Sequence, residues 1–184
     1  MMARRFSPLC AKSSTSVVWF VVATLWFVAV GLGVGLHADE KRSLPAFQVA
    51  TLDGAAVASS QIGPAGQSLL IYVTPTSPAS ARLLAAMKAW QTDAMAQRVV
   101  VVIGAPVAAA QAFVSERATE FANVRWFADP QGEAWKALRL TGTPYLLGVR
   151  DGQIAWALAG VLNDPMALES VVRSWVEPKA PTGR

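Results

Sequence analysis

The chain has 184 residues and a net charge of +4, a length that allows one domain with a proper hydrophobic core. Its lone cysteine, Cys10, and its lone histidine, His37, both precede the globular part, which excludes a disulfide, a thiolate zinc site and Ser–His–Asp catalysis there. Three of the 16 Lys and Arg residues precede the apolar segment, leaving 13 against 12 Asp and Glu. The near-neutral globular part shows no clustered basic face, so we expect no nucleic-acid partner.

The first predicted element is a membrane-spanning helix. Residues 17–36 contain no charge, which is enough to cross the roughly 30 Å of hydrocarbon in a bilayer. The basic residues before it place the N-terminus in the cytoplasm. We therefore predict a cytoplasmic tail (1–16) and a single-pass anchor (17–37), whose contacts with other helices would use the residues Trp19, Trp26, Gly31 and Gly35.

The rival interpretation of the same segment is a cleaved signal peptide. A cut after Ala38 would put Leu36 at the −3 position, where a small residue is preferred. The apolar run is also long for a signal, so a retained anchor is favoured. A short linker, residues 38–45, then leads into a globular domain over residues 46–177, and residues 178–184 read as a flexible tail.

The domain opens with a hairpin and then a strand that runs into a helix. Alternation over residues 47–57 around Asp53-Gly54 predicts the hairpin. Residues 69–73 form an apolar run of strand length, broken at residues 74–76. Ser77 then stands at a helix cap with Pro78 at the first helical position, and the helix is predicted to continue to about residue 96. Such a junction is where α/β proteins place anion sites and reactive groups.

The remaining elements alternate between strands and helices. We expect strands over 98–104, 124–127, 145–149 and 154–158, and helices over 106–118 and 133–140. Trp135 and Leu138 are expected on the inner side of the latter helix. Asn163 or Asp164 caps a last helix beginning at Pro165, and its predicted apolar stripe consists of Leu168, Val171, Val172 and Trp175.

This order of elements resembles the thioredoxin fold, in the membrane-anchored, TlpA-like branch that faces the bacterial periplasm. The resemblance covers residues 45–176. It rests on the 47–57 hairpin, the strand leading into residues 76–80, the Asp-Pro-Gln-Gly turn at 129–132, and Thr143-Pro144 with Asp151-Gly152. It implies an α/β three-layer sandwich with a mixed central sheet, attached to the bacterial inner membrane with the soluble domain in the periplasm.

The segment T-P-T-S-P-A-S-A-R-L-L, residues 74–84, resembles the active site of the thioredoxin-like accessory proteins of methylamine dehydrogenase maturation. Those proteins have cysteines where this chain has Ser77 and Ser80, so Ser77, Pro78, Ala79 and Ser80 form a degenerate active site. Disulfide exchange needs a thiolate, and no base is evident to activate a serine hydroxyl. We expect no catalytic residue, metal or cofactor.

The resemblance also implies a site for a protein partner. Pro144 would be cis and lie beside Ser77, and the Thr143 backbone would pair with an extended peptide in a groove that includes Thr76. The alternative interpretation is that Thr143-Pro144 only fixes the start of a strand.

Three hypotheses for function follow from this pattern. The leading one is a redox-inactive binding protein that assists assembly or maturation of a periplasmic redox enzyme or cytochrome. The alternatives are a permanent accessory subunit of a membrane complex, and a thiol–disulfide relay component that relies on a partner's cysteines. Each predicts a protein partner in the periplasm or inner membrane, and no small-molecule substrate is evident.

Overall fold

The computed structural model describes residues 42–90, 92–117, 119–121, 123–160 and 164–177, all within one compact unit, His37–Arg184. The predicted tail 1–16, the anchor 17–37 with Trp19, Trp26, Gly31 and Gly35, and residues 38–41 and 178–184 lie outside the described residues. Within the described ranges, no helix is long and apolar enough to cross a membrane.

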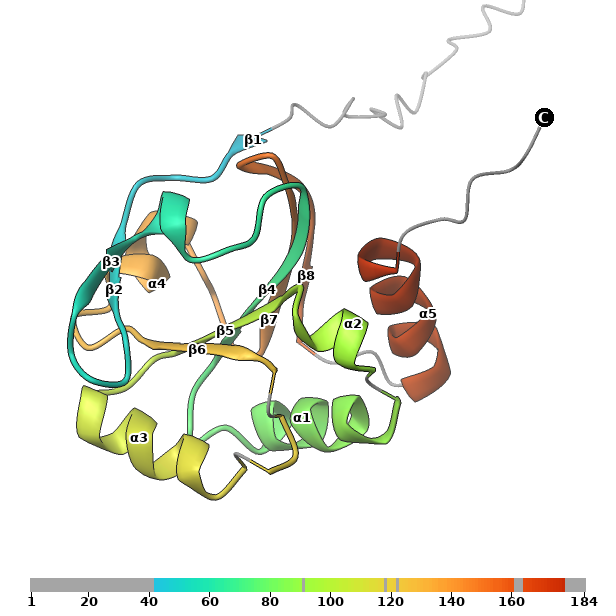
Figure 1. Ribbon diagram of the computed structural model, residues 1–184, viewed down its shortest axis with the longest axis horizontal. Coiled ribbons are helices and arrows are strands. Elements are labelled where there is room, and N and C mark those ends of the chain that lie inside the picture. Colours follow the sequence, from blue (N-terminus) through green and yellow to red (C-terminus); the bar gives the residue numbers. More distant parts are fainter. Residues whose placement is uncertain (1–41, 91, 118, 122, 161–163, 178–184) are drawn as a thin grey trace, which may run out of the picture. The chain divides into compact units, whose positions relative to one another are not determined.

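A mixed sheet runs through the middle of the domain (Figure 1), with its strands in the order β1-β8-β7-β4-β5-β6-β2-β3. The three strands β4, β5 and β6 are parallel, and every other pairing is antiparallel. The described strands are β1 (Arg42–Ser43), β2 (Gln48–Ala50), β3 (Ala56–Ala58), β4 (Gln67–Val73), β5 (Val99–Ile103), β6 (Arg125–Ala128), β7 (Tyr145–Arg150) and β8 (Gln153–Ala159).

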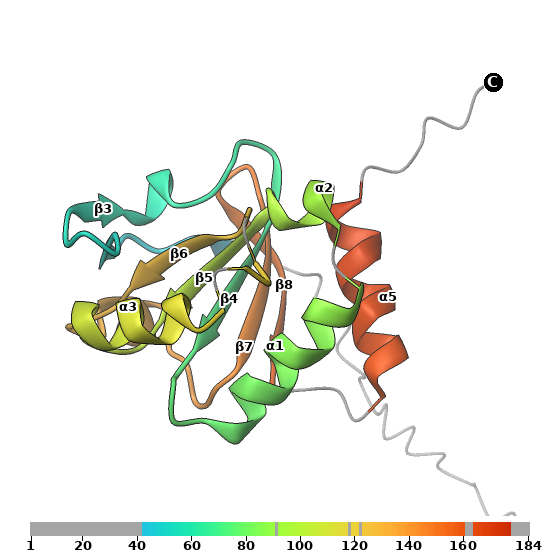
Figure 2. The same cartoon turned by 60° about the horizontal axis from the view of Figure 1, so that its bottom comes forward.

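Helices cover both faces of this sheet. The described helices are the 3₁₀ turn η1 (Ser59–Gln61), α1 (Pro78–Trp90), α2 (Asp93–Ala96), α3 (Val107–Ser115), α4 (Glu133–Leu138) and α5 (Pro165–Val176). Residues of α1, α2, α3 and α5 pack in the core cluster on one face, and α4 packs in the cluster on the other (Figures 1 and 2). The expected three-layer sandwich with a mixed sheet is therefore confirmed.

Strand β4 shows why the central strands read as unbroken apolar runs. Leu69, Ile71 and Val73 point into the α1 side of the core, while Leu70 and Tyr72 point into the α4 side. Because both faces are covered, all five side chains are buried and the sequence does not alternate with polar residues. The same holds for β5, which is buried along its whole length.

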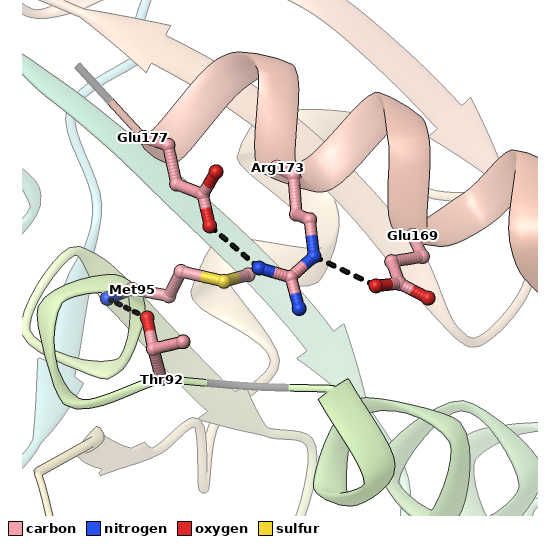
Figure 3. A network of polar contacts seen from close by, with 5 residues as sticks. All are labelled: Thr92, Met95, Glu169, Arg173 and Glu177. Carbon is pink, nitrogen blue, oxygen red and sulfur yellow. Dashed lines mark hydrogen bonds and ion pairs between the residues drawn. The ribbon is translucent and has the colours of Figure 1, made fainter.

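One predicted helix is wrong in its extent. Residues 78–96 form two helices, α1 and α2, because Thr92 adopts an extended conformation with φ −116° and ψ 162°. Its hydroxyl accepts a hydrogen bond from the Met95 N–H at 3.3 Å (Figure 3). Thr92 thus caps a new helix start, a signal that the helical spacing of the apolar residues obscured.

The predicted inner stripe of α5 is also wrong at one position. Leu168, Val172 and Val176 are buried, whereas Val171 is 38% exposed. Adjacent helical residues lie about 100° apart, so Val171 falls beside the buried stripe. Arg173 makes ion pairs on both sides, at 2.7 Å each (Figure 3), with Glu169 and Glu177.

Candidate functional site

The end of β4 and the start of α1 form a tight junction built around Ser77. The Ser77 N–H donates to the Thr74 carbonyl at 3.1 Å, which closes the turn after β4. The Ser77 hydroxyl accepts from the Ser80 N–H at 3.2 Å, and its carbonyl accepts from the Ala81 N–H at 3.1 Å. Ser77 is therefore the N-cap of α1, and Pro78 follows at the first helical position, where no N–H is needed.

Two side-chain hydrogen bonds join this junction to the segment before β7. The Ser77 hydroxyl donates to the Thr143 carbonyl at 3.3 Å, and the hydroxyls of Thr74 and Thr143 lie 2.9 Å apart. The Thr143–Pro144 peptide bond is cis, as the resemblance implies. We call Thr74, Ser77, Ser80 and Thr143 the Ser77–Thr143 site.

The residues of this junction differ in how far they are exposed to solvent. Ser77, Ala79 and Thr143 are half-buried and Pro78 is exposed, whereas Pro144 is buried. Ser80 is fully buried, and its hydroxyl accepts from the Thr74 N–H at 3.4 Å. Of the two serines, only Ser77 reaches the surface.

Thr76, which the sequence placed in the predicted groove, and Thr74, which it did not, differ in their contacts. Thr76 is exposed, and none of its atoms makes a hydrogen bond to a described residue. Thr74, which was not predicted, contacts both Ser80 and Thr143. The sequence feature that could have identified Thr74 is its position directly after the buried strand β4.

The chemistry available at the Ser77–Thr143 site is limited to hydroxyls and backbone groups. The Ser77 hydroxyl both accepts and donates a hydrogen bond, so its proton is directed at a carbonyl and away from the surface. In the described part of the chain, the Thr143 N–H has no hydrogen-bond acceptor. The described residues also contain no group of three or more His, Cys, Asp or Glu placed to hold a metal ion.

A second polar cluster, which the sequence did not reveal, lies on the α4 side of β4. Asp129, only 3% exposed, accepts hydrogen bonds from the Tyr72 hydroxyl at 2.9 Å, the Glu133 N–H at 2.8 Å and the Trp135 N–H at 3.1 Å. The Asp129 carboxylate therefore binds the start of α4 to β4. We call Tyr72 and Asp129, with these two N–H donors, the Tyr72–Asp129 cluster.

Burial, with the nearby Asp129 charge, raises the pKa of Tyr72 well above its usual range, because both effects disfavour the phenolate. The cluster also excludes a side chain at Gly104, since a Cβ built there would lie 2.6 Å from the Tyr72 hydroxyl.

Comparison with solved structures identifies the fold. The domain is similar to a putative thiol:disulfide interchange protein DsbE from Chlorobium tepidum, at 21% identity and a TM-score of 0.60, covering 75% of this chain and 98% of that one. It is also similar to a secreted disulfide oxidoreductase of Mycobacterium tuberculosis (21% identity, TM-score 0.54, 70% and 95% covered). A third is StoA from Bacillus subtilis (16% identity, TM-score 0.52, 69% and 96% covered).

The protein has a thioredoxin-like fold. The sequence predicted this fold from the order of its elements. No protein-family model matches the chain, and no curated protein matches it. The narrower resemblance to methylamine dehydrogenase accessory proteins, the membrane anchor and the loss of redox chemistry stay predictions.

Proposed function

We propose that this protein is a redox-inactive, thioredoxin-like binding protein that assists assembly or maturation of a periplasmic redox enzyme or cytochrome. The observation that carries the proposal is the state of the Ser77 hydroxyl. It caps α1 through the Ser80 N–H and donates to the Thr143 carbonyl, so both of its hydrogen-bonding functions are used to hold the site together.

The residues around Ser77 support the absence of thiol chemistry. Disulfide exchange requires a thiolate to attack sulfur, and Ser77 and Ser80 carry hydroxyls at both positions. The hydrogen-bond partners of these two hydroxyls among the described residues are the Thr143 carbonyl and the N–H groups of Ser80 and Thr74, and none of them is a base that could activate a serine hydroxyl. The lone Cys10 falls on the cytoplasmic side in the proposed topology.

The backbone beside Pro144 supports peptide binding. Thr143 is half-buried, and its N–H has no acceptor among the described residues. This N–H is a donor that an extended peptide could use in strand-like pairing, while the Thr143 carbonyl already accepts from the Ser77 hydroxyl. The next carbonyl, that of Pro144, already accepts from the Gly160 N–H at 2.8 Å, so Thr143 is the available backbone position.

The proposed location is the bacterial inner membrane. It rests on the uncharged residues 17–36 with basic residues before them, a pattern that places the following domain outside the cytoplasm. A protein held there meets periplasmic proteins, which is the partner class proposed.

The test is affinity purification of tagged full-length protein from its own membranes in mild detergent, followed by identification of the co-purifying proteins. Ala79→Trp places a bulky side chain beside Ser77 and is expected to abolish co-purification of the partner. Ser77→Ala, the matched change within the same turn, is expected to retain it. Equal retention by both variants would refute the Ser77–Thr143 site as the binding surface.

The redox part of the proposal has a separate test. The purified protein is expected to catalyse no thiol-dependent reduction of a disulfide substrate above the buffer rate. Activity that survives Cys10→Ser would show that the hydroxyl site, or a co-purifying partner, supports catalysis, and it would overturn the proposal.

A further inference from the structure

Residues 141–143, which join α4 to β7, have few polar contacts with the rest of the domain. The backbone hydrogen bonds on either side of this segment involve Leu140 and Pro144. Between them, Thr143 is the only residue that makes a hydrogen bond to another described residue. A Cβ built on Gly142 would meet no atom within 4 Å. The polar contacts that place this segment are therefore the two hydrogen bonds of Thr143.

These two bonds differ in length. The Thr143 hydroxyl lies 2.9 Å from the Thr74 hydroxyl, close to the usual O–H···O distance of about 2.8 Å. The Thr143 carbonyl accepts from the Ser77 hydroxyl at 3.3 Å, which is longer than that distance. Because a hydrogen bond weakens as it lengthens, Thr74 is the stronger of the two partners of Thr143.

The register of the sheet explains why the two threonines meet. Strands β4 and β7 pair antiparallel as far as Tyr72 and Tyr145, and two residues further on the same register puts Thr74 opposite Thr143. The intervening residue on the β7 side is Pro144, which has no N–H and cannot continue the ladder. The hydroxyl pair thus takes the place of a backbone pair at the end of the ladder.

Thr74 is itself fixed by its neighbours. It directly follows β4, whose last residues are buried. Its N–H donates to the Ser80 hydroxyl at 3.4 Å, and its carbonyl accepts from the Ser77 N–H at 3.1 Å. Both of its backbone groups are therefore used within the junction with α1, and only the side chain of Thr74 joins it to Thr143.

We propose that Thr74 is a positioning residue for the partner-binding backbone at Thr143. Its hydroxyl holds the Thr143 N–H, which has no acceptor among the described residues, in the place where an extended peptide pairs with it. This inference rests on the proposed function and adds to it a residue that acts through Thr143. The alternative interpretation is that the hydroxyl pair only closes the end of the sheet.

The first test measures the position of Thr143 without a partner, by nuclear magnetic resonance relaxation on the full chain in mild detergent. Thr74→Val is close to threonine in shape but lacks the hydroxyl. It is expected to lower the amide order parameter at Thr143 from about 0.85, typical of rigid backbone, to below about 0.6. Thr74→Ser keeps the hydroxyl and should keep the wild-type value. Tyr145, which pairs with Tyr72 through the backbone, should be unchanged in both variants.

The second test measures recovery of the co-purifying partner by tagged full-length protein from its own membranes. Thr74→Val is expected to reduce recovery about fivefold, in line with the loss of one hydrogen bond. Thr74→Ser, the matched control, should stay within about twofold of wild type. Thr143→Val removes the other hydroxyl of the pair, so the double variant with Thr74→Val should lose no more than either single variant.

The two measurements separate failure of this inference from failure of the proposed function. An unchanged order parameter at Thr143 in Thr74→Val would overturn the inference and leave the proposed function standing. Equal effects of Thr74→Val and Thr74→Ser would assign the change to packing and would overturn it as well.

A lowered order parameter with undiminished recovery of the partner would show that the partner binds away from the Thr143 backbone, and the inference would fail. If the wild type recovered no partner while Thr74→Val still lowered the order parameter, the proposed function would be refuted. The hold of Thr74 on the Thr143 backbone would then be confirmed without it.

Discussion

Two hydrogen-bond networks begin two residues apart at the end of β4 and differ in kind. Tyr72, in β4, points to the α4 side and donates to the buried Asp129 carboxylate. That carboxylate accepts three hydrogen bonds in all, of 2.8–3.1 Å. Thr74, just after β4, belongs to the half-buried Ser77–Thr143 site, whose bonds to Ser77 and Ser80 side chains measure 3.2–3.4 Å.

The difference lies in what happens to a group that loses its partner. A buried carboxylate without its donors pays the full desolvation penalty, so the Tyr72–Asp129 cluster is fixed and structural. Hydroxyls at a half-buried site can exchange a protein partner for water at little net cost. Substitutions at half-buried Ser77 are therefore expected to preserve the fold, whereas Ser80 of the same site is fully buried.

The largest expected loss of stability comes from Asp129→Ala. It leaves the Tyr72 hydroxyl and two N–H groups without an acceptor in the core, so the free energy of unfolding should fall by about 3 kcal/mol. Urea denaturation of the full chain in mild detergent measures it. Asp129→Asn, which keeps one acceptor oxygen, should lose less; equal losses would mean that the retained amide oxygen does not stabilise the cluster.

Tyr72→Phe is expected to cost about 1.5 kcal/mol at neutral pH, the usual worth of a hydrogen bond to a charged acceptor. The pKa of Tyr72 is raised in the folded state, so the folded protein keeps a proton that the unfolded chain loses above about pH 10. This contribution is present below pH 10 and is lost as the pH rises further.

The same denaturation measured at increasing pH tests that linkage. Stability of the wild type should fall above pH 10 by about 1.4 kcal/mol per pH unit from this one group. Tyr72→Phe should remove that slope. A slope shared by both proteins would assign it to other groups.

Ser77→Ala, at the half-buried site, should lower the free energy of unfolding by about 1 kcal/mol, the usual value of an N-cap. Ser77→Asp is the matched control. It keeps an oxygen for the Ser80 N–H and places negative charge at the helix N-terminus, so its stability should stay within about 0.5 kcal/mol of wild type. A loss as large as that of Ser77→Ala would mean that the bond to Thr143 outweighs the cap.

The smallest expected change in stability, under about 0.5 kcal/mol, belongs to the double variant Ser77→Cys with Ser80→Cys in a Cys10→Ser background, because the thiols replace hydroxyls of similar size. This variant should gain disulfide exchange, since a thiol at a helix N-terminus has a pKa below about 8.5.

A disulfide-reduction assay and the pH dependence of thiolate absorbance measure that gain. Ser77→Ala with Ser80→Cys, which lacks the outer nucleophile, should stay inactive. Absence of exchange in the double variant would show that the site lacks more than thiols.

The sequence by itself determined the order of the elements and the cap at Ser77, because buried strands, turn residues and N-caps are local patterns. It also shows that Thr143-Pro144 directly precedes β7. Their position beside Ser77, however, was predicted only from the resemblance. The division of residues 78–96 into α1 and α2 depended on the extended conformation of Thr92. The helical spacing of the apolar residues does not predict that conformation. The exposure of Val171 depended on which side of α5 meets the sheet.

Only the tertiary structure decided which polar residues meet. Tyr72 and Asp129 are 57 positions apart and Thr74 and Thr143 are 69 apart, separations over which no local pattern operates. Tyr72 reads as one more apolar residue in a buried strand, and Asp129 as part of an ordinary turn. Their contact exists because parallel pairing places the ends of β4, β5 and β6 at one edge of the sheet.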